Sequence, residues 1–395
     1  MKQAETSHLN SAGEFRLAVV TAGESADRIN AITEYSAHLK SALASEGLRA
    51  DLHLRSEGRR FVLAGAAPGA ALGLVRQMRG YDAMVLQYNP FMYGRWGFTP
   101  WLPLALRRLR RAAPRPLITL MVHEPCVDIV DWRSFLMGVW QRVQLASLVR
   151  SSDVVFVSVE AWTSYLHGRR RSTSIIHLPV GSNLPDGREL RRAERESLGL
   201  APGGLVLAAF GTGHPGRLAH YAVAAANRLA RSGRQVTLLN LGQGAPGLAG
   251  LDERVRVHRP GALPDHIVAA RLASADIFLA PYVDGVSSRR TAFMAALQHA
   301  LPVVGTDGAS TDPFLRLATE AMWLVPAGNR ECFAEAVLTL ALNANLRSAM
   351  GNAARRLYEE QFSWPVLAGR LRRSLLGTSH TGLLEADERR VGAAG

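Results

Sequence analysis

Lysine is almost absent from this chain. Lys2 and Lys40 are its only lysines, so 44 of its 46 basic residues are arginines. An enzyme that uses pyridoxal phosphate needs a lysine for the Schiff base. Here Lys2 lies in a predicted terminal tail and Lys40 on a predicted helix face. The chain is therefore not expected to be a pyridoxal phosphate enzyme.

Cysteine is scarce as well. Cys126 and Cys332 stand alone in distant segments, without the paired spacing of a zinc site or the cysteine density of a secreted disulfide scaffold. Both thiols are expected to be reduced and structural. The sequence also has no run of eighteen apolar residues and no basic-then-apolar signal pattern at its start, which makes a cytoplasmic location the default expectation.

What is present is an ordinary globular composition with a strong positive charge. The 395 residues suffice for two domains with cores of their own, and 48% are hydrophobic and 20% charged. A net charge of +13 attracts anions, so nucleic acid, anionic lipid and phosphorylated small molecules are candidate partners. A GC-rich genome would favour arginine over lysine, so the arginine excess alone says little about function.

Short apolar segments of strand type alternate with segments of helical period through both halves of the chain. Apolar strands joined by helices indicate a parallel sheet covered on both faces. The predicted strands of the first half occupy residues 15–23, 50–54, 81–88, 116–124, 153–158 and 172–180. Those of the second half occupy residues 205–211, 236–242, 255–261, 275–282, 302–306 and 321–328.

The sequence therefore predicts an α/β protein with two Rossmann-like, doubly wound domains. The first covers residues 15–180 and the second 205–356, with a polar connection over 181–204 and a flexible N-terminus over 1–14. In such sheets ligands bind beyond the carboxyl ends of the strands, and a two-domain protein closes its cleft around them. A site is expected in the loops that follow the strands.

The loop PYVDGVSSRR, residues 281–290, follows one predicted strand. Ser287 or Ser288 is expected to cap the next helix, which places Arg289 and Arg290 in its first turn. Cations there oppose the helix dipole, but a bound anion would reverse that cost. The amides of the four residues before the arginines would help to hold a diphosphate; these residues are Gly285, Val286, Ser287 and Ser288. The alternative is a pair of solvated arginines.

Two further loops carry candidate residues. FGTGHPGR follows a strand and has the GxGxxG spacing of a phosphate loop, with Gly211, Thr212, Gly213, His214 and Arg217 as its candidates. No acidic residue suited to a ribose follows the next strand, which disfavours a nicotinamide dinucleotide, and the glycines could equally be simple turn formers. In VHE, His123 could act on a ligand oxygen with Glu124 orienting it.

Taken together, these loops resemble those of the retaining GT-B glycosyltransferases, specifically glycosyltransferase family four. The resemblance covers about residues 15–376. It rests on TAG followed by EYSAHLKSAL, on VHE, on HLPVGSN, on FGTGHPGR, and on ADIFLAPYVDGVSSRR with AALQHALPVVGT. The segment EEQFSWPVLAGRLRRSLL resembles the C-terminal helix of the family, expected over 357–378, which crosses back to the N-terminal domain. A flexible tail is expected over 379–395.

The resemblance implies transfer of a sugar, of hexosyl type, from a UDP- or GDP-sugar to an acceptor hydroxyl with retained anomeric configuration. The donor would bind the C-terminal domain and the acceptor the N-terminal one. His123 would contact the donor sugar, His214 and Arg217 would lie by the diphosphate, and Asp284 would begin the cradle that ends at Ser288. Gly23 would let the backbone approach the ligand.

The same resemblance implies that no cofactor or metal is needed. Arg289 or Arg290 would neutralise the leaving diphosphate, and the chain contains no Asp-x-Asp motif. One departure from the family pattern concerns its second glutamate, whose place is taken here by Ala292 or Ala295. Neither side chain can bind a ribose hydroxyl, so the nucleotide is left open, and a degenerate site that binds without turnover is an alternative.

On the acceptor side, Trp96, Phe98, Trp101 and Leu102 precede a cluster of arginines within residues 90–116. This combination suits peripheral contact with the inner face of a membrane or stacking on sugar faces, and the alternative is a core-packed loop and helix with a basic edge. The competing functions are another GT-B enzyme such as an epimerase, and a non-catalytic basic protein that binds nucleic acid. The dispersed arginines and the lack of a recognised module argue against specific nucleic-acid binding.

Overall fold

The structure is a computed structural model. It describes residues 15–22, 31–55, 67–167, 173–201, 203–214, 216–244 and 247–392, without the side chains of residues 67 and 379–392. The chain divides into two compact units. Unit 1 comprises Met1–Phe156, Arg169–Ile175 and Leu371–Gly395, and unit 2 comprises Val157–Gly168 and Ile176–Arg370.

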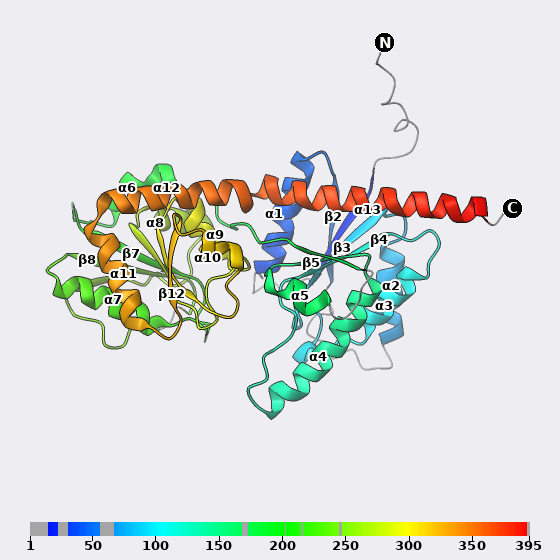
Figure 1. Cartoon of the computed structure of the whole chain (residues 1–395), viewed down its shortest axis with the longest axis horizontal. Coiled ribbons are helices and arrows are strands. Elements are labelled where there is room, and N and C mark those ends of the chain that lie inside the picture. Colours follow the sequence, from blue (N-terminus) through cyan, green and yellow to red (C-terminus); the bar gives the residue numbers. More distant parts are fainter. Residues whose placement is uncertain are drawn as a thin grey trace, which may run out of the picture. The chain divides into compact units, whose positions relative to one another are not determined.

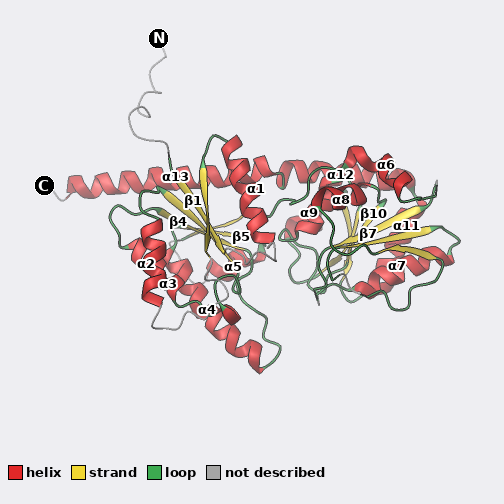
Figure 2. Ribbon diagram, turned by 180° about the vertical axis from the view of Figure 1, so that it is seen from behind, coloured by secondary structure: helices red, strands yellow, loops and turns green. Residues whose placement is uncertain are grey.

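Each unit is built on a six-stranded sheet with helices against it (Figures 1 and 2). In the first sheet the strand order is β2-β1-β3-β4-β5-β6. Its strands are β1 (Leu17–Ala22), β2 (Ala50–Arg55), β3 (Ala83–Tyr88), β4 (Leu117–Val122), β5 (Val154–Val157) and β6 (Ser174–His177). Every residue of β1, β3 and β5 is buried, as expected for parallel strands covered on both faces.

The helices associated with this sheet are α1 (Ala31–Ser45), α2 (Ala67–Gln77), the short 3-10 helix η2 (Arg95–Gly97), α3 (Trp101–Arg110) and α4 (Trp132–Ser151). Asp131 and Ser134 form a capping box that fixes the start of α4. One end of α4 projects beyond the sheet (Figures 1 and 2). Of the aromatic segment proposed for membrane contact, Trp101 and Leu102 are fully buried. That part of the membrane prediction is wrong, because these side chains pack in the core.

The second sheet has the order β12-β11-β10-β7-β8-β9. Its strands are β7 (Leu205–Phe210), β8 (Val236–Leu241), β9 (Val255–His258), β10 (Ile277–Ala280), β11 (Val303–Asp307) and β12 (Met322–Pro326). The helices of unit 2 are α5 (Ala161–His167), η3 (Arg188–Leu190), α6 (Arg191–Ser197), α7 (Ala219–Arg231), α8 (Asp265–Ala273), α9 (Thr291–Gln298), α10 (Pro313–Leu317), α11 (Arg330–Leu342) and α12 (Ala344–Gln361).

The core of unit 2 fills the space around β7, β8 and β10. Side chains of α7 and α11 pack into it, and Tyr221 of α7 meets Phe333 of α11 edge to face with ring centroids 5.4 Å apart. This packing holds β7 and β10 side by side, with their carboxyl ends at the same edge of the sheet. The predicted positions of all twelve strands agree with the structure.

The last helix, α13 (Trp364–Gly392), belongs to both units. At its first residue, Trp364, the indole Nε1 donates to the carbonyl of Ser182 at 2.7 Å. Leu371 and Leu375 are fully buried and belong to unit 1. The helix expected over 357–378 thus begins at Trp364, because α12 first ends at Gln361, and it continues into the segment where a tail was expected. No helix among the described residues is both long and apolar enough to cross a bilayer.

Candidate functional site

The candidate site of unit 2 lies where the loops after β7 and β10 meet. β7 is the first strand of its sheet along the chain, and its neighbours are β8 on one side and β10 on the other. This reversal of strand order is the place where open α/β sheets bind ligands. A Cβ on Gly211 would lie 3.7 Å from Nη1 of Arg217 and 4.0 Å from Cβ of Ala292. Residues from the two predicted loops are therefore neighbours.

Asp284 binds both arginines of the VDGVSSRR loop. Its Oδ2 accepts from Nη2 of Arg289 at 3.0 Å, and its Oδ1 forms an ion pair with Nη2 of Arg290. Burial disfavours ionisation of the carboxyl, but the two guanidinium groups outweigh it and hold the pKa of Asp284 below its usual value. The arginines are thus not surplus charge on a solvated turn. They are partly neutralised within the protein.

Arg217 and Tyr282 complete this cluster. The guanidinium carbon of Arg290 lies 3.9 Å from the ring centroid of Tyr282, a cation–π contact. Nη1 of Arg217 donates to the carbonyl of Gly211 at 2.8 Å. Burial lowers the pKa of both Arg217 and Arg290, and the charge of Arg290 adds to the effect on Arg217. Arg289 and Arg290 share the carboxylate of Asp284, and Arg217 bonds to backbone carbonyls, so the three guanidinium groups and one carboxylate leave a net charge of about +2 for an anion.

The start of α9 corrects two predictions. The helix begins at Thr291 with Arg290 at its N-cap position and no capping side chain. Neither serine caps it, and neither arginine lies in its first turn. Oγ of Ser288 instead donates to the carbonyl of Ser158 at 2.7 Å. The prediction that a serine caps α9 is wrong. The hydroxyl of Ser288 is bonded to Ser158, a residue far away in the sequence, and the sequence pattern alone does not reveal this contact.

Most backbone N–H groups of the predicted cradle already donate hydrogen bonds to acceptors in the protein. The N–H groups of Gly285 and Val286 donate to carbonyls of Tyr282 and Thr306, and that of Ser288 donates to Oδ2 of Asp312. Gly285 has φ of 86°, and a Cβ there would lie 2.2 Å from Oγ1 of Thr311. The glycine is therefore needed for the turn.

Among the residues proposed for the cradle, Ser287 differs from the others in the hydrogen bonding of its side-chain hydroxyl group. Its side chain is fully buried, and its Oγ has no hydrogen-bond partner among the described residues. A buried hydroxyl without a partner costs free energy unless a ligand or water satisfies it. Of the proposed cradle, Ser287 is thus the residue that keeps hydrogen-bonding capacity.

Asp312, which the sequence did not single out, holds the loop of residues 281–290 through hydrogen bonds to backbone N–H groups. It is fully buried, and its oxygens accept from the N–H of Ser288 at 2.7 Å and of Glu160 at 2.6 Å. His177 lies on the same cluster, with Nε2 2.9 Å from Oγ of Ser288. In the sequence, Asp312 precedes Pro313 and has the pattern of an ordinary helix cap. No local signal distinguishes it from one.

The glycine loop after β7 is shaped by a second loop. A Cβ on Gly213 would lie 1.9 Å from the carbonyl oxygen of Gly244, and one on Gly242 would lie 2.4 Å from that of Gly211. The glycines are therefore required for backbone-on-backbone packing. Thr212 is exposed, and Nδ1 of His214 accepts from the N–H of Gly216 at 3.0 Å. This loop keeps an exposed surface next to Arg217.

His123 and Glu124 follow β4 in unit 1. The imidazole Nε2 lies 2.7 Å from Oε1 of Gln87, and the ring meets that of Tyr35 edge to face at 4.9 Å. The amide of Gln87 helps to orient the imidazole, and Glu124 accepts from Nδ2 of Asn89 at 2.9 Å. Burial lowers the pKa of His123 to about 3, so its imidazole is neutral at physiological pH.

The remaining predicted positions are Gly23 and the two alanines, Ala292 and Ala295, considered for the absent second glutamate. Gly23 lies outside the described residues. Ala295 is fully buried in the core, whereas Ala292 is half-buried and borders the loop at Gly211. Of the two positions considered for the absent second glutamate, Ala292 is therefore the one beside the candidate site. The described residues contain no group of three or more histidine, cysteine or acidic side chains placed to hold a metal ion.

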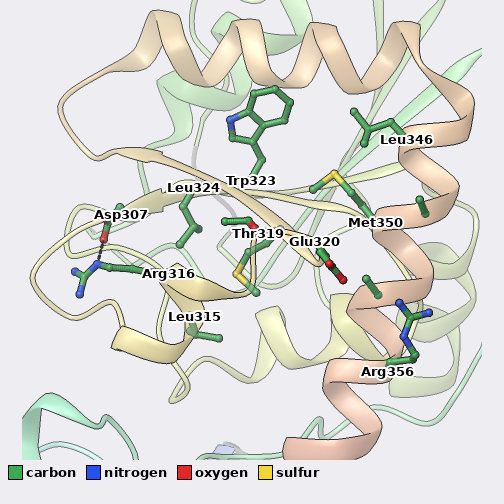
Figure 3. A pocket seen from close by; sticks show the side chains of 13 residues that line it. Asp307, Leu315, Arg316, Thr319, Glu320, Trp323, Leu324, Leu346, Met350 and Arg356 are labelled. Atoms are coloured by element: carbon green, nitrogen blue, oxygen red, sulfur yellow. Dashed lines mark hydrogen bonds and ion pairs between the residues drawn. The ribbon is translucent and has the colours of Figure 1, made fainter.

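A separate cavity of about 670 Å³ lies between α10, β12 and α12 of unit 2 (Figure 3). Leu315, Trp323 and Met350 contribute apolar surface to it, and Arg316 forms an ion pair with Asp307 at 2.8 Å on one side. None of the site residues predicted from the sequence lines this cavity. The volume of a cavity alone does not identify the site.

Comparison with known proteins supports the fold. The family model of glycosyl transferases group 1 matches residues 205–343. The chain is similar to sucrose-phosphate synthase from Thermosynechococcus elongatus, with a TM-score of 0.65 and 16% identity over 92% of this chain and 99% of that one. It is also similar to WaaG, a glycosyltransferase involved in lipopolysaccharide biosynthesis, with a TM-score of 0.62 and 14% identity over 91% and 100%.

A third similar structure is that of HepE from Anabaena in complex with UDP and glucose. Its TM-score is 0.62, with 15% identity over 92% of this chain and 100% of that one. None of the curated proteins compared with the chain matches it significantly. These likenesses confirm the predicted fold class, two Rossmann-like domains of the GT-B type.

Proposed function

We propose that this protein is a glycosyltransferase that moves a sugar from a UDP- or GDP-sugar to an acceptor hydroxyl. The observation that carries the proposal is the match of residues 205–343 to group 1 glycosyl transferases, because this segment contains Arg217, Arg289 and Arg290. The structure of HepE, described as a complex with UDP-glucose, supports a nucleotide sugar as donor. The donor diphosphate then binds at the carboxyl ends of β7 and β10.

The arginine cluster supplies the chemistry that this reaction needs. When the bond between the sugar and the diphosphate breaks, negative charge develops on the leaving phosphate. Guanidinium groups fixed in a partly buried site stabilise that charge without having to reorganise, and they bind phosphate oxygens through two N–H groups at once. The proposed transfer is metal-independent, because the net positive charge of the cluster replaces the charge of a metal.

Retention of configuration is part of the proposal and rests on the resemblance to family four. The resemblance also assigns His123 to the donor sugar. For that role the chain offers a neutral imidazole held by Gln87, which can exchange hydrogen bonds with hydroxyl groups but adds no charge. The reaction is of the kind used in glycan or natural-product biosynthesis.

The test is to incubate the purified chain with a panel of UDP- and GDP-sugars in the presence of EDTA. The proposal expects one donor to bind saturably in calorimetry and to release free nucleotide slowly by hydrolysis. Proton NMR of the first released sugar should show the anomer of the donor. An epimerase would instead change the sugar without releasing nucleotide. If no nucleotide sugar binds while DNA binds strongly at low salt, the chain is a basic binding protein.

A further inference from the structure

The N-terminal part of α4 exposes an unusual apolar surface. Trp132, Phe135, Leu136, Val139 and Val143 are each between 46% and 68% exposed. Ile129 and Val130, in the segment just before the helix, are also exposed. We call these seven residues the α4 apolar face. Single exposed hydrophobic side chains are common, but a contiguous group of this size marks an interaction surface.

The geometry of the helix makes the face continuous. Positions 132, 135, 136, 139 and 143 recur at the spacing that places side chains on one side of a helix. The opposite side is committed to unit 1, where Gln141, Leu145 and Leu148 are fully buried. A Cβ on Gly138 would lie 3.4 Å from Ile129, so the preceding segment folds back along the helix. The core of unit 1 therefore does not use the apolar face.

The charges on α4 itself are all positive, whereas Asp128 and Asp131 lie in the segment before it. α4 contains no aspartate or glutamate, and it carries Arg133, Arg142 and Arg150. The guanidinium carbon of Arg133 lies 5.3 Å from the ring centroid of Trp132. Asp131, directly before the helix, is engaged in the capping box. An apolar stripe with tryptophan at one end and arginines beside it matches helices that lie in a membrane interface.

Two other partners, a small molecule and a second copy of the chain, fit the α4 apolar face less well than a membrane does. Binding sites for small molecules are concave, whereas this face is a row of exposed side chains along one helix, and one end of that helix projects beyond the sheet (Figures 1 and 2). The stripe from Trp132 to Val143 spans only about 18 Å along the helix. A second copy packed on this face would bring the arginines of α4 in both copies together, and like charges oppose such pairing.

We propose that the α4 apolar face is a membrane-contact surface that inserts into the headgroup region of a bilayer containing anionic lipid. The aliphatic and aromatic side chains gain by leaving water, and the flanking arginines, like the net charge of +13, gain by approaching anionic headgroups. The surface differs from residues 96–111, where Trp101 and Leu102 are buried. The inference does not depend on the proposed sugar transfer.

The test is flotation of the full chain with two kinds of vesicle, phosphatidylcholine alone and phosphatidylcholine with about 30% phosphatidylglycerol. The wild-type chain should float with the anionic vesicles. The triple variant Trp132→Gln, Phe135→Gln, Leu136→Gln should partition at least about tenfold more weakly, because three large side chains lose their apolar contact. Arg133→Gln should weaken partitioning about fivefold, and on anionic vesicles only.

A matched control replaces three leucines that are exposed to a similar degree elsewhere. Leu54→Gln, Leu317→Gln and Leu342→Gln together should leave partitioning unchanged. The inference is overturned if the wild-type chain stays unbound with anionic vesicles, or if the α4 triple variant floats as well as the wild type. Sedimentation without lipid provides a third check. A wild-type dimer that the α4 triple variant converts to monomer would show that a second copy, not a membrane, covers the face.

Discussion

Asp284 acts as a built-in anion for the arginines next to it. Its carboxylate holds Arg289 and Arg290 in place, and their side chains are about one-fifth exposed. A diphosphate that enters the site meets guanidinium groups that are already oriented, so less side-chain entropy is lost on binding. The single acidic charge reduces the positive field but does not cancel it.

The first prediction concerns these arginines. The double variant Arg289→Ala, Arg290→Ala should weaken binding of UDP at least about tenfold, because charge-assisted hydrogen bonds to phosphate are lost. Calorimetry measures the change. The control variant Arg316→Ala, Arg330→Ala removes two other ion-paired arginines of unit 2 and should bind UDP as the wild type does. Equal affinity of both double variants would show that the cluster is not the diphosphate site.

A second prediction at this scale uses the buried imidazole of His123. Its pKa is about 3 in the folded chain and about 6.5 in the unfolded chain. Between these values the unfolded state binds the extra proton, so the free energy of unfolding falls as the pH is lowered through this window. Burial lowers the pKa of His177 and His299 as well, which adds to the same trend.

Replacing His123 isolates its contribution to the pH dependence of the free energy of unfolding. Between pH 7.5 and 5 the wild type should lose about 2 kcal/mol more stability than His123→Gln, as measured by urea unfolding at both pH values. His177 and His299 are present in both proteins, so their contributions cancel in the comparison. An identical pH dependence of the two proteins would mean that His123 is accessible to protons in the folded state.

At the scale of elements, the loops after the strands depend on backbone contacts that leave no room for a side chain. Gly213→Ala would place a Cβ against the carbonyl oxygen of Gly244, so the two loops must separate. We expect a loss of roughly 1–3 kcal/mol in stability together with weaker binding of UDP. Thermal unfolding and calorimetry measure these effects. Gly328→Ala meets nothing within 4 Å and should change neither quantity.

The strands could be predicted from the sequence because most are local apolar runs, and β2 and β9 alternate apolar and polar residues. The arginine cluster was also indicated, since Asp284, Arg289 and Arg290 share one loop and Arg217 follows a neighbouring strand. The role of Ser288 could not be predicted. Its partners Ser158 and Asp312 are 130 and 24 residues away in the chain, and only the folded topology brings them together.

At the scale of the whole molecule, one helix serves both units. A chain that ends after Arg370 would lack Leu371 and Leu375, which are fully buried and belong to unit 1. Burial of two leucines contributes roughly 3–6 kcal/mol, so unit 1 should unfold at a lower temperature while unit 2 is little changed. Limited proteolysis read by mass spectrometry should then cut peptides of residues 67–156 before those of 205–343.

A chain that ends after Thr378 serves as the control for this truncation. It keeps both leucines and should resist proteolysis as the full chain does. If the chain that ends after Arg370 were equally resistant, the leucines of α13 would contribute nothing to unit 1.

The division of α13 also sets an order of events during protein synthesis. The ribosome makes the strands of the first sheet, then the rest of unit 2 up to Arg370, and only afterwards Leu371 and Leu375. The residues of unit 2 therefore leave the ribosome before Leu371 and Leu375, and the core of unit 1 is completed only when these two leucines arrive. During that interval the nascent unit 1 exposes apolar surface that α13 later covers, and it is the part of the protein most in need of a chaperone.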